Sequence, residues 1–262
     1  GYINTGAWSE KAIKEAKNLG ETLIIGDSSD RNFNYIPKNL NIPTDLDYLH
    51  YTSNNTIYGT QFKSLPSASD ILVCDMSSDI FSQKIEVNKF GLIYAGAQKN
   101  MGPAGTTLVI VNNDILGKTE RNIPTMLDYS VHINKESMFN TPPVFPIYVS
   151  MLTLQWLKDL GGVEEIEKIN TKKAQILYDE IDRNSMFEGF ANNDDRSTMN
   201  VTFNIINESL QEQFDSLCNN NGINGLKGHR SVGGYRASIY NALPISSVEH
   251  LINLMQKFEK KI

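Results

Sequence analysis

A lone lysine, Lys99, follows an apolar run with strand character in the stretch FGLIYAGAQKNMGPAG, residues 90–105. The interval from Val87 to Asn113 contains no Asp or Glu, so no acid close in sequence would hold this amine in its charged form. A lysine that is desolvated without a carboxylate has a lowered pKa and becomes nucleophilic. Such amines form Schiff bases with carbonyl compounds, including pyridoxal phosphate. The simpler alternative is a solvated loop lysine. Small residues around it are expected to leave room for a bulky group: Gly96, Ala97, Gly102, Ala104 and Gly105.

Asp75 closes the apolar run ILVC and precedes Lys99 in the chain. An acid at this place could simply cap a helix that begins near Ser77. Paired with a Schiff-base lysine on a later strand, it also has the chemistry that a pyridoxal enzyme needs. A carboxylate beside the pyridine nitrogen keeps the ring protonated, and the protonated ring withdraws electrons from the substrate.

A basic segment occurs late in an otherwise acidic chain. Between Asp215 and Glu249 there is no acidic residue, although the chain has 30 acids among 262 residues. An exposed charged surface normally mixes both signs, so we interpret the segment as an anion-binding site, with a solvated charge run as the alternative. The planar fork of arginine suits carboxylates and phosphates. The basic residues of the segment are Lys227, His229, Arg230 and Arg236.

Composition bounds the class of protein. The chain has 40% hydrophobic residues and a net charge of −6, which is typical of an ordinary soluble domain and argues against a nucleic-acid or membrane partner. No apolar run reaches the length of a membrane-spanning helix. Cys74 and Cys218 are far apart and the four histidines are scattered, so we expect no metal site and a cytoplasmic, reducing location.

The chain must position these groups on a sheet. Short runs rich in Ile, Leu and Val predict strands buried on both faces of a mostly parallel sheet covered by helices, an α/β fold. Several of these runs end in polar residues, and ligands bind at the carboxyl ends of strands in such sheets. The predicted strands are residues 23–28, 48–53, 71–78, 91–97 and 106–111.

Helical and mixed patterns complete the prediction. Ser9 is expected to cap a helix that runs to Leu19 and stops at Gly20. We interpret residues 1–162 as a large domain and residues 163–262 as a smaller α+β domain. Later elements are predicted as helices over 147–160, 163–181 and 246–262, and as a strand with one wet face over 199–205.

Four motifs closely resemble those of phosphoserine aminotransferases, which are pyridoxal-phosphate enzymes of the aspartate-aminotransferase fold (fold type I). The resemblance runs from NTGAWSEKAIKEAK near the start to the last helix. The motifs are DMSSD (75–79), AGAQKNMGPAG (95–105), FNTPP (139–143) and GHRSVGGYRASIYNALP (228–244).

The resemblance implies a role for each matching residue. Lys99 would carry pyridoxal 5′-phosphate as a Schiff base and would move the substrate's α-proton, while Asp75 would pair with the pyridine nitrogen. Trp8 would stack on the ring, and Thr56 would donate its hydroxyl to the ring oxygen. Gln98 would bind the cofactor phosphate.

Two further residues, Asn140 and Thr141, in the family reach the cofactor phosphate of the neighbouring subunit, which implies a homodimer with shared sites. A structural alternative stands beside each role: Trp8 as a hydrophobic staple, Gln98 as a residue that orients its loop, Thr56 as a turn residue, and Asn140-Thr141 as a stiff connector.

The resemblance also implies the substrates. Arg236 would hold the substrate α-carboxylate, and His229 and Arg230 would bind either the phosphate or the side-chain carboxylate of glutamate. The implied reaction converts O-phospho-L-serine and 2-oxoglutarate to 3-phosphohydroxypyruvate and L-glutamate, in serine biosynthesis. Family members also act on 4-phosphohydroxy-L-threonine in pyridoxine biosynthesis.

The chain departs from the family at its start. Family members carry a portion before the Trp-bearing segment that helps to bind substrate and cofactor, whereas this sequence begins GYINTGAWSEK. We therefore expect an N-terminally incomplete large domain and a weakly active or inactive 262-residue piece. The alternatives are another fold-type-I pyridoxal enzyme, such as a desulfurase or a different aminotransferase, and a non-catalytic structural piece.

Overall fold

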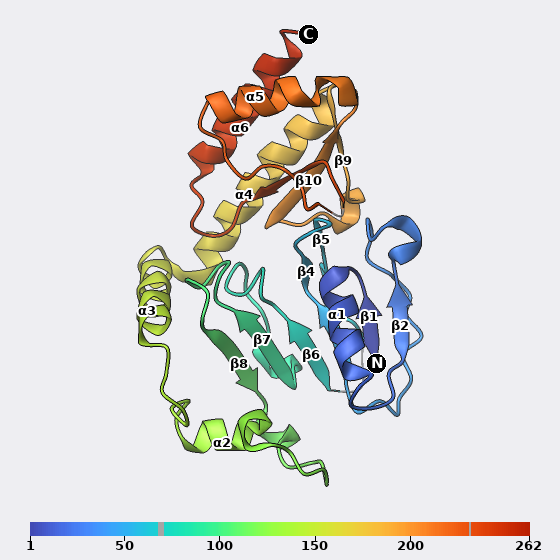
Figure 1. The fold of residues 1–262 in the computed structure, drawn as a ribbon, viewed down its shortest axis with the longest axis vertical. Helices are drawn as coiled ribbons and strands as arrows, with labels where there is room; N and C mark the ends of the chain where they lie inside the picture. The colour runs from blue at the N-terminus through green and yellow to red at the C-terminus, as the bar shows by residue number, and fades with distance from the viewer. Residues whose placement is uncertain (68–70, 231) are drawn as a thin grey trace.

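The computed structural model of the chain describes residues 1–67, 71–230 and 232–262. Within these residues the strands form two main sheets, which lie toward opposite ends of the long axis of the molecule (Figure 1). Helix α4 (Gly162–Arg183) runs from the junction between the two halves into the half with the smaller sheet. A short hairpin of β4 (Asn54–Asn55) and β5 (Thr60–Gln61) lies at the same junction.

The larger sheet has six strands in the order β2-β1-β3-β6-β7-β8. Strand β8 pairs antiparallel with β7, and the other neighbours run parallel. The predicted mostly parallel α/β sheet is therefore confirmed, although β1 was not predicted. The strands are β1 Tyr2–Asn4, β2 Ile24–Asp27, β3 Leu49–Thr52, β6 Leu72–Asp75, β7 Leu92–Gly96 and β8 Thr107–Val111.

Parallel pairing brings the carboxyl ends of β3, β6 and β7 to one edge of the sheet. Thr52 at the end of β3 is opposite Asp75 at the end of β6, and Asp75 is opposite Tyr94 in β7. The loop from β7 to β8 starts at Ala97, directly after the last residue of β7. Polar residues that are far apart in the chain are therefore neighbours at this edge.

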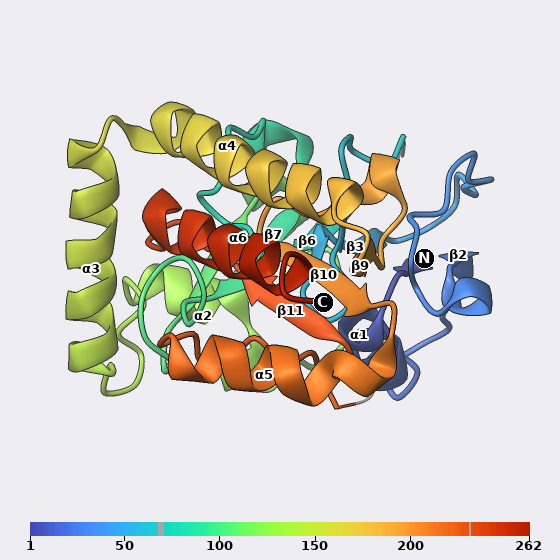
Figure 2. The same ribbon diagram turned by 90° about the horizontal axis from the view of Figure 1, so that it is seen from above.

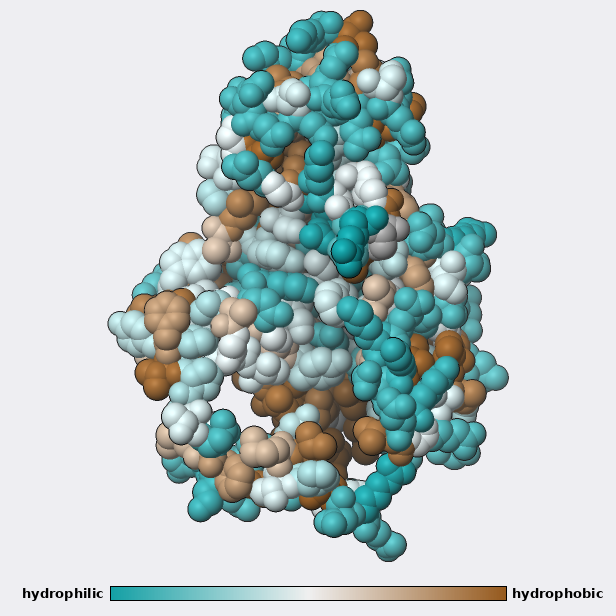
Figure 3. Space-filling model, in the orientation of Figure 1, coloured by the Kyte–Doolittle hydropathy of each residue, from teal (hydrophilic) through white to brown (hydrophobic). Residues whose placement is uncertain are grey.

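One face of the six-stranded sheet is only partly covered. Helix α1 (Ala7–Ala16) and the segment 115–130 stand beside a hollow of about 1540 Å³, and Val73 and Tyr94 contribute to its floor (Figure 3). Strands β2 and β8, which lie at the two edges, contain only exposed and half-buried residues. The prediction that these strands are buried on both faces is therefore wrong for the edge strands, which have a neighbour on one side only.

The smaller sheet is antiparallel and has the order β11-β10-β9. Figure 2 shows α4, α5 and α6 side by side over its strands. The core between the helices and the sheet includes Phe203, Phe214 and Phe258. The remaining elements of this half are β9 Phe187–Gly189, β10 Asn200–Ile205, β11 Tyr235–Ser238, α5 Gln211–Asn220 and α6 Ile245–Glu259.

Strand β10 is buried on both faces, which corrects the prediction of one wet face. Val201 and Phe203 belong to the core under the helices. Thr202 points to the opposite face, because side chains alternate along a strand, and it donates a hydrogen bond to the carbonyl oxygen of Tyr58 over 2.9 Å. The second face of β10 therefore packs on the β4–β5 hairpin.

The position of residue 162 agrees with the division into two halves. All strands of the six-stranded sheet precede residue 162, and all strands of the three-stranded sheet follow it. Each sheet also has a hydrophobic core of its own. We keep the division into domains 1–162 and 163–262 as a proposal.

Helix α1 begins earlier than predicted. Its first residue is Ala7 and its N-cap is Gly6, so Ser9 lies within the first turn. The Ser9 hydroxyl oxygen accepts hydrogen bonds from the N–H groups of Thr5 and Gly6. The prediction that Ser9 is the N-cap is therefore wrong, and the residue supports the helix start from inside the helix.

Two more helices follow the six-stranded sheet, α2 (Tyr129–Asn134) and α3 (Val144–Asp159). Helix α3 starts three residues before the predicted range, directly after Pro143. No helix in the described ranges is long and apolar enough to span a bilayer.

Gly59 generates a prediction about the junction. Its φ is +72°, and an added Cβ would lie 2.8 Å from the Asn200 carbonyl oxygen. We expect Gly59→Ala to lower the free energy of unfolding by about 3 kcal/mol, because it adds a backbone clash to the left-handed strain. The control is Gly222→Ala, where φ is +80° and nothing lies within 4 Å. This variant should lose about 1 kcal/mol. Equal losses in denaturant titrations would contradict the role given to Gly59.

Candidate active site

Lys99 lies in the loop between β7 and β8, at the edge where β3 and β6 also end. Its Nζ donates a hydrogen bond to Thr56 Oγ1 over 2.8 Å. Thr56 is buried in the turn between β4 and β5. The Lys99 Nζ also lies 5.7 Å from the centre of the Trp8 ring on α1. Three segments that are distant in sequence thus converge on one amine.

The surroundings of Lys99 lower its pKa from the ordinary value. Burial is the largest cause and lowers the pKa of Lys99. The Arg236 charge lowers this pKa further, while the charges of Asp75 and Asp79 oppose the change. Within the described ranges, Lys99 has no carboxylate at ion-pair distance. The amine is therefore more nucleophilic near neutral pH than an exposed lysine.

Asp75 uses only part of its hydrogen-bonding capacity. Its Oδ1 accepts a hydrogen bond from the N–H of Ser77 over 2.9 Å. The residues after Asp75 form a turn and not a helix, so the alternative that Asp75 caps a helix is wrong. Its Oδ2 accepts no hydrogen bond from the described residues, which leaves it available to a ligand.

A second carboxylate, Asp79, lies close to the first and was not predicted as a site residue. Its side chain is buried and accepts hydrogen bonds from Ser53 Oγ over 2.5 Å and from Gln61 Nε2 over 3.3 Å. Burial raises the pKa of Asp79 to about 6, and the Asp75 charge adds to the rise. The signal in the sequence was the second acid of the DMSSD motif.

The side chains of Trp8 and Gln98 have different surroundings. Trp8 lies inside α1 and is 43% exposed, so the hydrophobic-staple alternative, which needs a residue before the N-cap, does not apply. Its ring therefore has surface available for stacking. Gln98 is exposed, and its side chain folds over Gly96, where an added Cβ would lie 2.6 Å from Gln98 Oε1.

The small residues after Lys99 have another use than predicted. A Cβ on Gly102 would lie 3.1 Å from the Ser150 Cα, and a Cβ on Gly105 would lie 3.0 Å from Pro146. Both neighbours belong to α3. The expectation that these two glycines leave room for a ligand is therefore wrong, since α3 fills the space.

Arg236 contributes a cation from β11 with one open donor. Its Nε is buried and has no hydrogen-bond partner among the described residues, and its charge acts on both Lys99 and Tyr240. Tyr240, which sequence reasoning missed, accepts a hydrogen bond from Asn200 Nδ2 over 3.1 Å and interacts with Thr56. An anion between Lys99 and Arg236 would satisfy the guanidinium.

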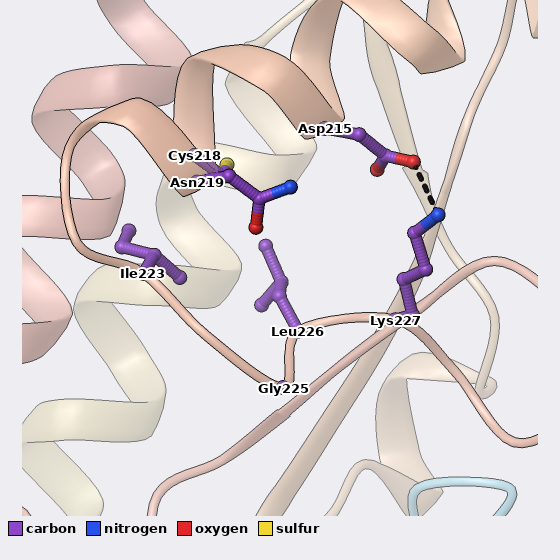
Figure 4. A pocket seen from close by; sticks show the side chains of 7 residues that line it. All are labelled: Asp215, Cys218, Asn219, Ile223, Gly225, Leu226 and Lys227. Atoms are coloured by element: carbon purple, nitrogen blue, oxygen red, sulfur yellow. Dashed lines mark ion pairs between the residues drawn. The ribbon is translucent and has the colours of Figure 1, made fainter.

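The anion segment does not include Lys227. Figure 4 shows Lys227 paired with Asp215, and their charged atoms lie 2.8 Å apart. A count along the sequence missed this pair because Asp215 borders the acid-free interval. His229 is half-buried and Arg230 is exposed in the loop before β11. The remaining residue of the GHRS motif, Ser231, lies outside the described residues.

Asn140 and Thr141 are not part of this cluster. Both are exposed in the connection between α2 and α3, and Asn140 Nδ2 contacts only the Thr141 carbonyl oxygen, over 3.4 Å. No described contact joins them to Lys99 within one chain. Their predicted role toward a neighbouring subunit stays a prediction.

The arrangement fits pyridoxal phosphate. Lys99 offers an amine with a lowered pKa, Trp8 an exposed indole, Asp75 a carboxylate oxygen and Arg236 a buried guanidinium nitrogen, the last two without a hydrogen-bond partner among the described residues. Each of these groups matches a different part of the cofactor or of an amino acid bound to it.

Comparison with known proteins identifies the class. The family model for class-V aminotransferases matches residues 3–251, most of the chain. The chain therefore belongs to the class-V aminotransferases, a pyridoxal-phosphate-dependent enzyme class.

Relatives narrow the family. The phosphoserine aminotransferases of Flavobacterium psychrophilum and Flavobacterium johnsoniae are 63% and 60% identical over 261 residues, which cover 100% of this chain and 73% of each relative. A solved phosphoserine aminotransferase, studied for radiation damage of its Schiff base, superposes with a TM-score of 0.96 at 50% identity, over 100% of this chain and 74% of that one.

The pyridoxal-phosphate-bound enzyme of Trichomonas vaginalis superposes with a TM-score of 0.91 at 34% identity, over 97% of this chain and 74% of that one. The chain belongs to the phosphoserine aminotransferase family and spans about 73% of the length of the curated relatives it matches. These similarities lead to the phosphoserine aminotransferases, and not to the desulfurases or to a different family of aminotransferases.

Asp79 generates a prediction about pH. Its pKa is about 6 in the folded protein, above its ordinary value of 3.8. Between these two values the folded protein binds more protons than the unfolded chain, so the Asp79 contribution to stability is lost as pH rises. In Asp79→Asn this loss is absent. The free energy of unfolding of the variant, relative to the unchanged protein, should therefore rise by up to about 3 kcal/mol between pH 4 and pH 7. A difference that is independent of pH in denaturant titrations would contradict the prediction.

Proposed function

We propose that this chain is a phosphoserine transaminase that interconverts O-phospho-L-serine plus 2-oxoglutarate and 3-phosphohydroxypyruvate plus L-glutamate, a reaction of L-serine biosynthesis. Membership of the phosphoserine aminotransferase family supports the reaction. The observation that carries the proposal is the desolvated, unpaired amine of Lys99 beside Trp8 and Thr56. A cytoplasmic location agrees with such a biosynthetic role.

Pyridoxal phosphate would be held by residues of the cluster and its margins. Lys99 would bond to the cofactor aldehyde until the amine of an amino-acid substrate takes its place, which frees the lysine. Trp8 would stack on the ring, and Asp75 would present a carboxylate oxygen to the ring nitrogen. Thr56 would donate to the ring oxygen, and Gln98 would bind the phosphate. When bound, the cofactor supplies an electron-withdrawing ring that makes the α-proton of an amino acid acidic.

The residues of this chain supply the proton transfer. Burial lowers the pKa of Lys99, which favours the neutral amine that can accept the α-proton of the bound amino acid. Thr56 Oγ1, 2.8 Å away, holds the amine in place between transfers. The same amine then returns the proton to the bound molecule.

Substrate recognition is assigned to cations of the smaller half. Arg236 binds the α-carboxylate, and this role is supported by its buried Nε, which no described residue pairs. His229 and Arg230 bind the second anionic group, which is a phosphate in phosphoserine and a carboxylate in glutamate. One pocket accepts both substrates because both groups are anions.

A homodimer with shared sites is part of the proposal. Hydrophobic side chains gather over α2 and α3 (Figure 3), where a monomer would leave them in water. Exposed residues of α3 include Val144, Phe145, Tyr148 and Met151. A second copy of the chain is expected to cover this surface and to receive Asn140 and Thr141 at its cofactor phosphate.

Cofactor attachment tests the site. In the full-length gene product, borohydride reduction with pyridoxal phosphate should fix the cofactor on Lys99, and mass spectrometry should locate it there. Lys99→Ala should abolish both the label and turnover, a loss of at least about 1000-fold, because the amine is nucleophile and base at once. Lys11→Ala is the matched control, since Lys11 lies 4.4 Å over the Trp8 ring but is exposed.

A second lysine serves as an internal control. Lys173 is buried and its pKa is lowered to about 8, but its Nζ donates to the carbonyl oxygens of Ile239, Tyr240 and Leu243. It should therefore stay unlabelled. Labelling elsewhere than Lys99, or equal turnover of serine and phosphoserine, would refute the proposed function.

Mixed dimers test the shared sites. Lys99→Ala and Asn140→Ala should each be nearly inactive alone. In a dimer formed from one of each, one site combines an intact Lys99 with the partner's intact Asn140, while the other site has neither. After unfolding and reassembly of an equal mixture, activity should recover to about a quarter of the unchanged level. A mixture that stays inactive, although sedimentation shows mixed dimers, would place both residues in the same subunit's site.

A further inference from the structure

Three buried asparagines form a continuous set of contacts beside the active-site lysine. Asn100 follows Lys99 directly, Asn241 follows β11, and Asn170 lies on α4. Their exposed fractions are 6%, 4% and 1%. We call these three residues the amide relay. Buried amides are costly unless their donors and acceptors are paired, so their contacts indicate what they hold.

Asn100 joins the two halves of the molecule with a single side chain. Its Oδ1 accepts a hydrogen bond from the backbone N–H of Asn241 over 3.0 Å. Its Nδ2 donates to the carbonyl oxygen of Ile80 over 3.2 Å. An ionised carboxylate lacks the donor and an apolar side chain lacks both groups, so neither Asp⁻ nor Leu would reproduce these two bonds.

The other two amides extend the set of contacts. Asn241 Nδ2 donates to the Phe81 carbonyl oxygen over 2.9 Å, and Asn241 Oδ1 accepts from Asn170 Nδ2 over 2.8 Å. Asn170 Nδ2 also lies 3.2 Å from the Ser82 carbonyl oxygen. Three consecutive carbonyl groups, from Ile80 to Ser82, are thus bound by three amides.

Each contact of the relay lies near a different group of the active site. Asn100 is adjacent to Lys99, the carbonyls of 80–82 follow the turn that begins at Asp75, and Asn241 lies five residues beyond Arg236. These three side chains must reach one small molecule together. Directional hydrogen bonds join their segments, and such bonds fix relative placement more closely than apolar contacts do.

We infer that the amide relay is a positioning device: Asn100 and Asn241 set the placement of Lys99, Asp75 and Arg236 relative to one another across the junction. This inference rests on the proposed function, because it assigns the relay to the same site. Asn100 and Asn241 act through the backbone segments that they hold.

A separate set of contacts keeps the two halves joined without the relay. Asn54 Nδ2 donates to Asn200 Oδ1 over 2.8 Å, and Ser197 Oγ donates to Asn54 Oδ1 over 2.5 Å. Thr202 binds the Tyr58 carbonyl oxygen in addition. Loss of one relay amide should therefore loosen the placement of the site without separating the halves.

Asn100→Ala in the full-length holoenzyme tests the relay. The KM values of phosphoserine and of glutamate should rise by the same factor, about tenfold, because both present the same α-carboxylate to Arg236. A variant that was merely less stable would lose active enzyme and kcat but would keep its KM. Equal factors for the two amino acids separate this effect from damage to the phosphate site.

A second readout uses the cofactor-free protein. Trace labelling with acetic anhydride over a range of pH, read by mass spectrometry of the Lys99 peptide, gives the midpoint at which this amine becomes reactive. Burial lowers the pKa of Lys99, so a loosened loop that admits water should move the midpoint to higher pH. This measurement needs neither substrate nor cofactor.

Asn184→Ala is the matched control. Asn184 is 2% exposed and donates to Glu180 Oε1 and to the Met255 carbonyl oxygen, within the smaller half. The control should lose stability but keep both the KM values and the Lys99 midpoint. Asn241→Ala keeps the backbone bond to Asn100 and loses the side-chain bonds. It should raise the KM values and the pH of the Lys99 midpoint as Asn100→Ala does, but by less.

The inference would be overturned if Asn100→Ala folds but keeps its KM values and its Lys99 midpoint. It would also be overturned if Asn184→Ala shows the same shifts as Asn100→Ala. Finally, if both relay variants unfold, the amides are determinants of the fold instead. A failure of the proposed function is distinguishable, because the unchanged protein would then not turn over phosphoserine at all. The Lys99 midpoint would still report on the relay in that case.

Discussion

The removal of one amine from water without a carboxylate beside it is the constraint on which the rest of the structure depends. Burial lowers the pKa of such a lysine, and the charges of its neighbours set the size of the change. The charges of Asp75 and Asp79 act on Lys99 without forming an ion pair, while the Arg236 charge acts in the opposite sense. The loop that carries Lys99 must therefore lie against segments that bury it but bring no acid within bonding distance. The chain meets this condition with an interval, Val87 to Asn113, that contains no acid at all.

The second constraint is that the cation for the substrate comes from the other half of the chain. Arg236 is on β11, and the amine is in the loop after β7. Apolar packing alone would hold these segments together but would allow small displacements, whereas buried hydrogen bonds have a preferred direction and length. The junction accordingly adds polar contacts, those of Asn54, Asn200 and Thr202 and those of the amide relay, to the apolar cluster around Tyr58 and Phe190.

Local sequence predicted five of the six strands of the larger sheet, because their signals are local, but it missed β1 and the short strands β4, β5, β9 and β11. An apolar run that ends in a polar residue marks the carboxyl end of a strand, and this rule selected Asp75 and Lys99 as candidates. The relay could not be found in this way, since Asn100 and Asn241 are 141 positions apart and a buried amide looks like a loop residue in sequence. The same limit explains Lys227, whose partner Asp215 lay at the border of the counted interval. Ser9 was misread because a serine in the first turn resembles an N-cap.

The glycines after Lys99 connect the site to the proposed dimer. Gly102 and Gly105 are small because α3 packs against them through Ser150 and Pro146, rather than because a ligand lies there. The opposite side of α3 carries exposed apolar residues, including Phe145 and Met151, which are the surface proposed for a second copy. One face of α3 therefore packs on the loop that carries Lys99, while the other is the surface that the proposed dimer would bury. In that dimer the helix would lie between the partner chain and the Lys99 loop, next to the connection that carries Asn140 and Thr141.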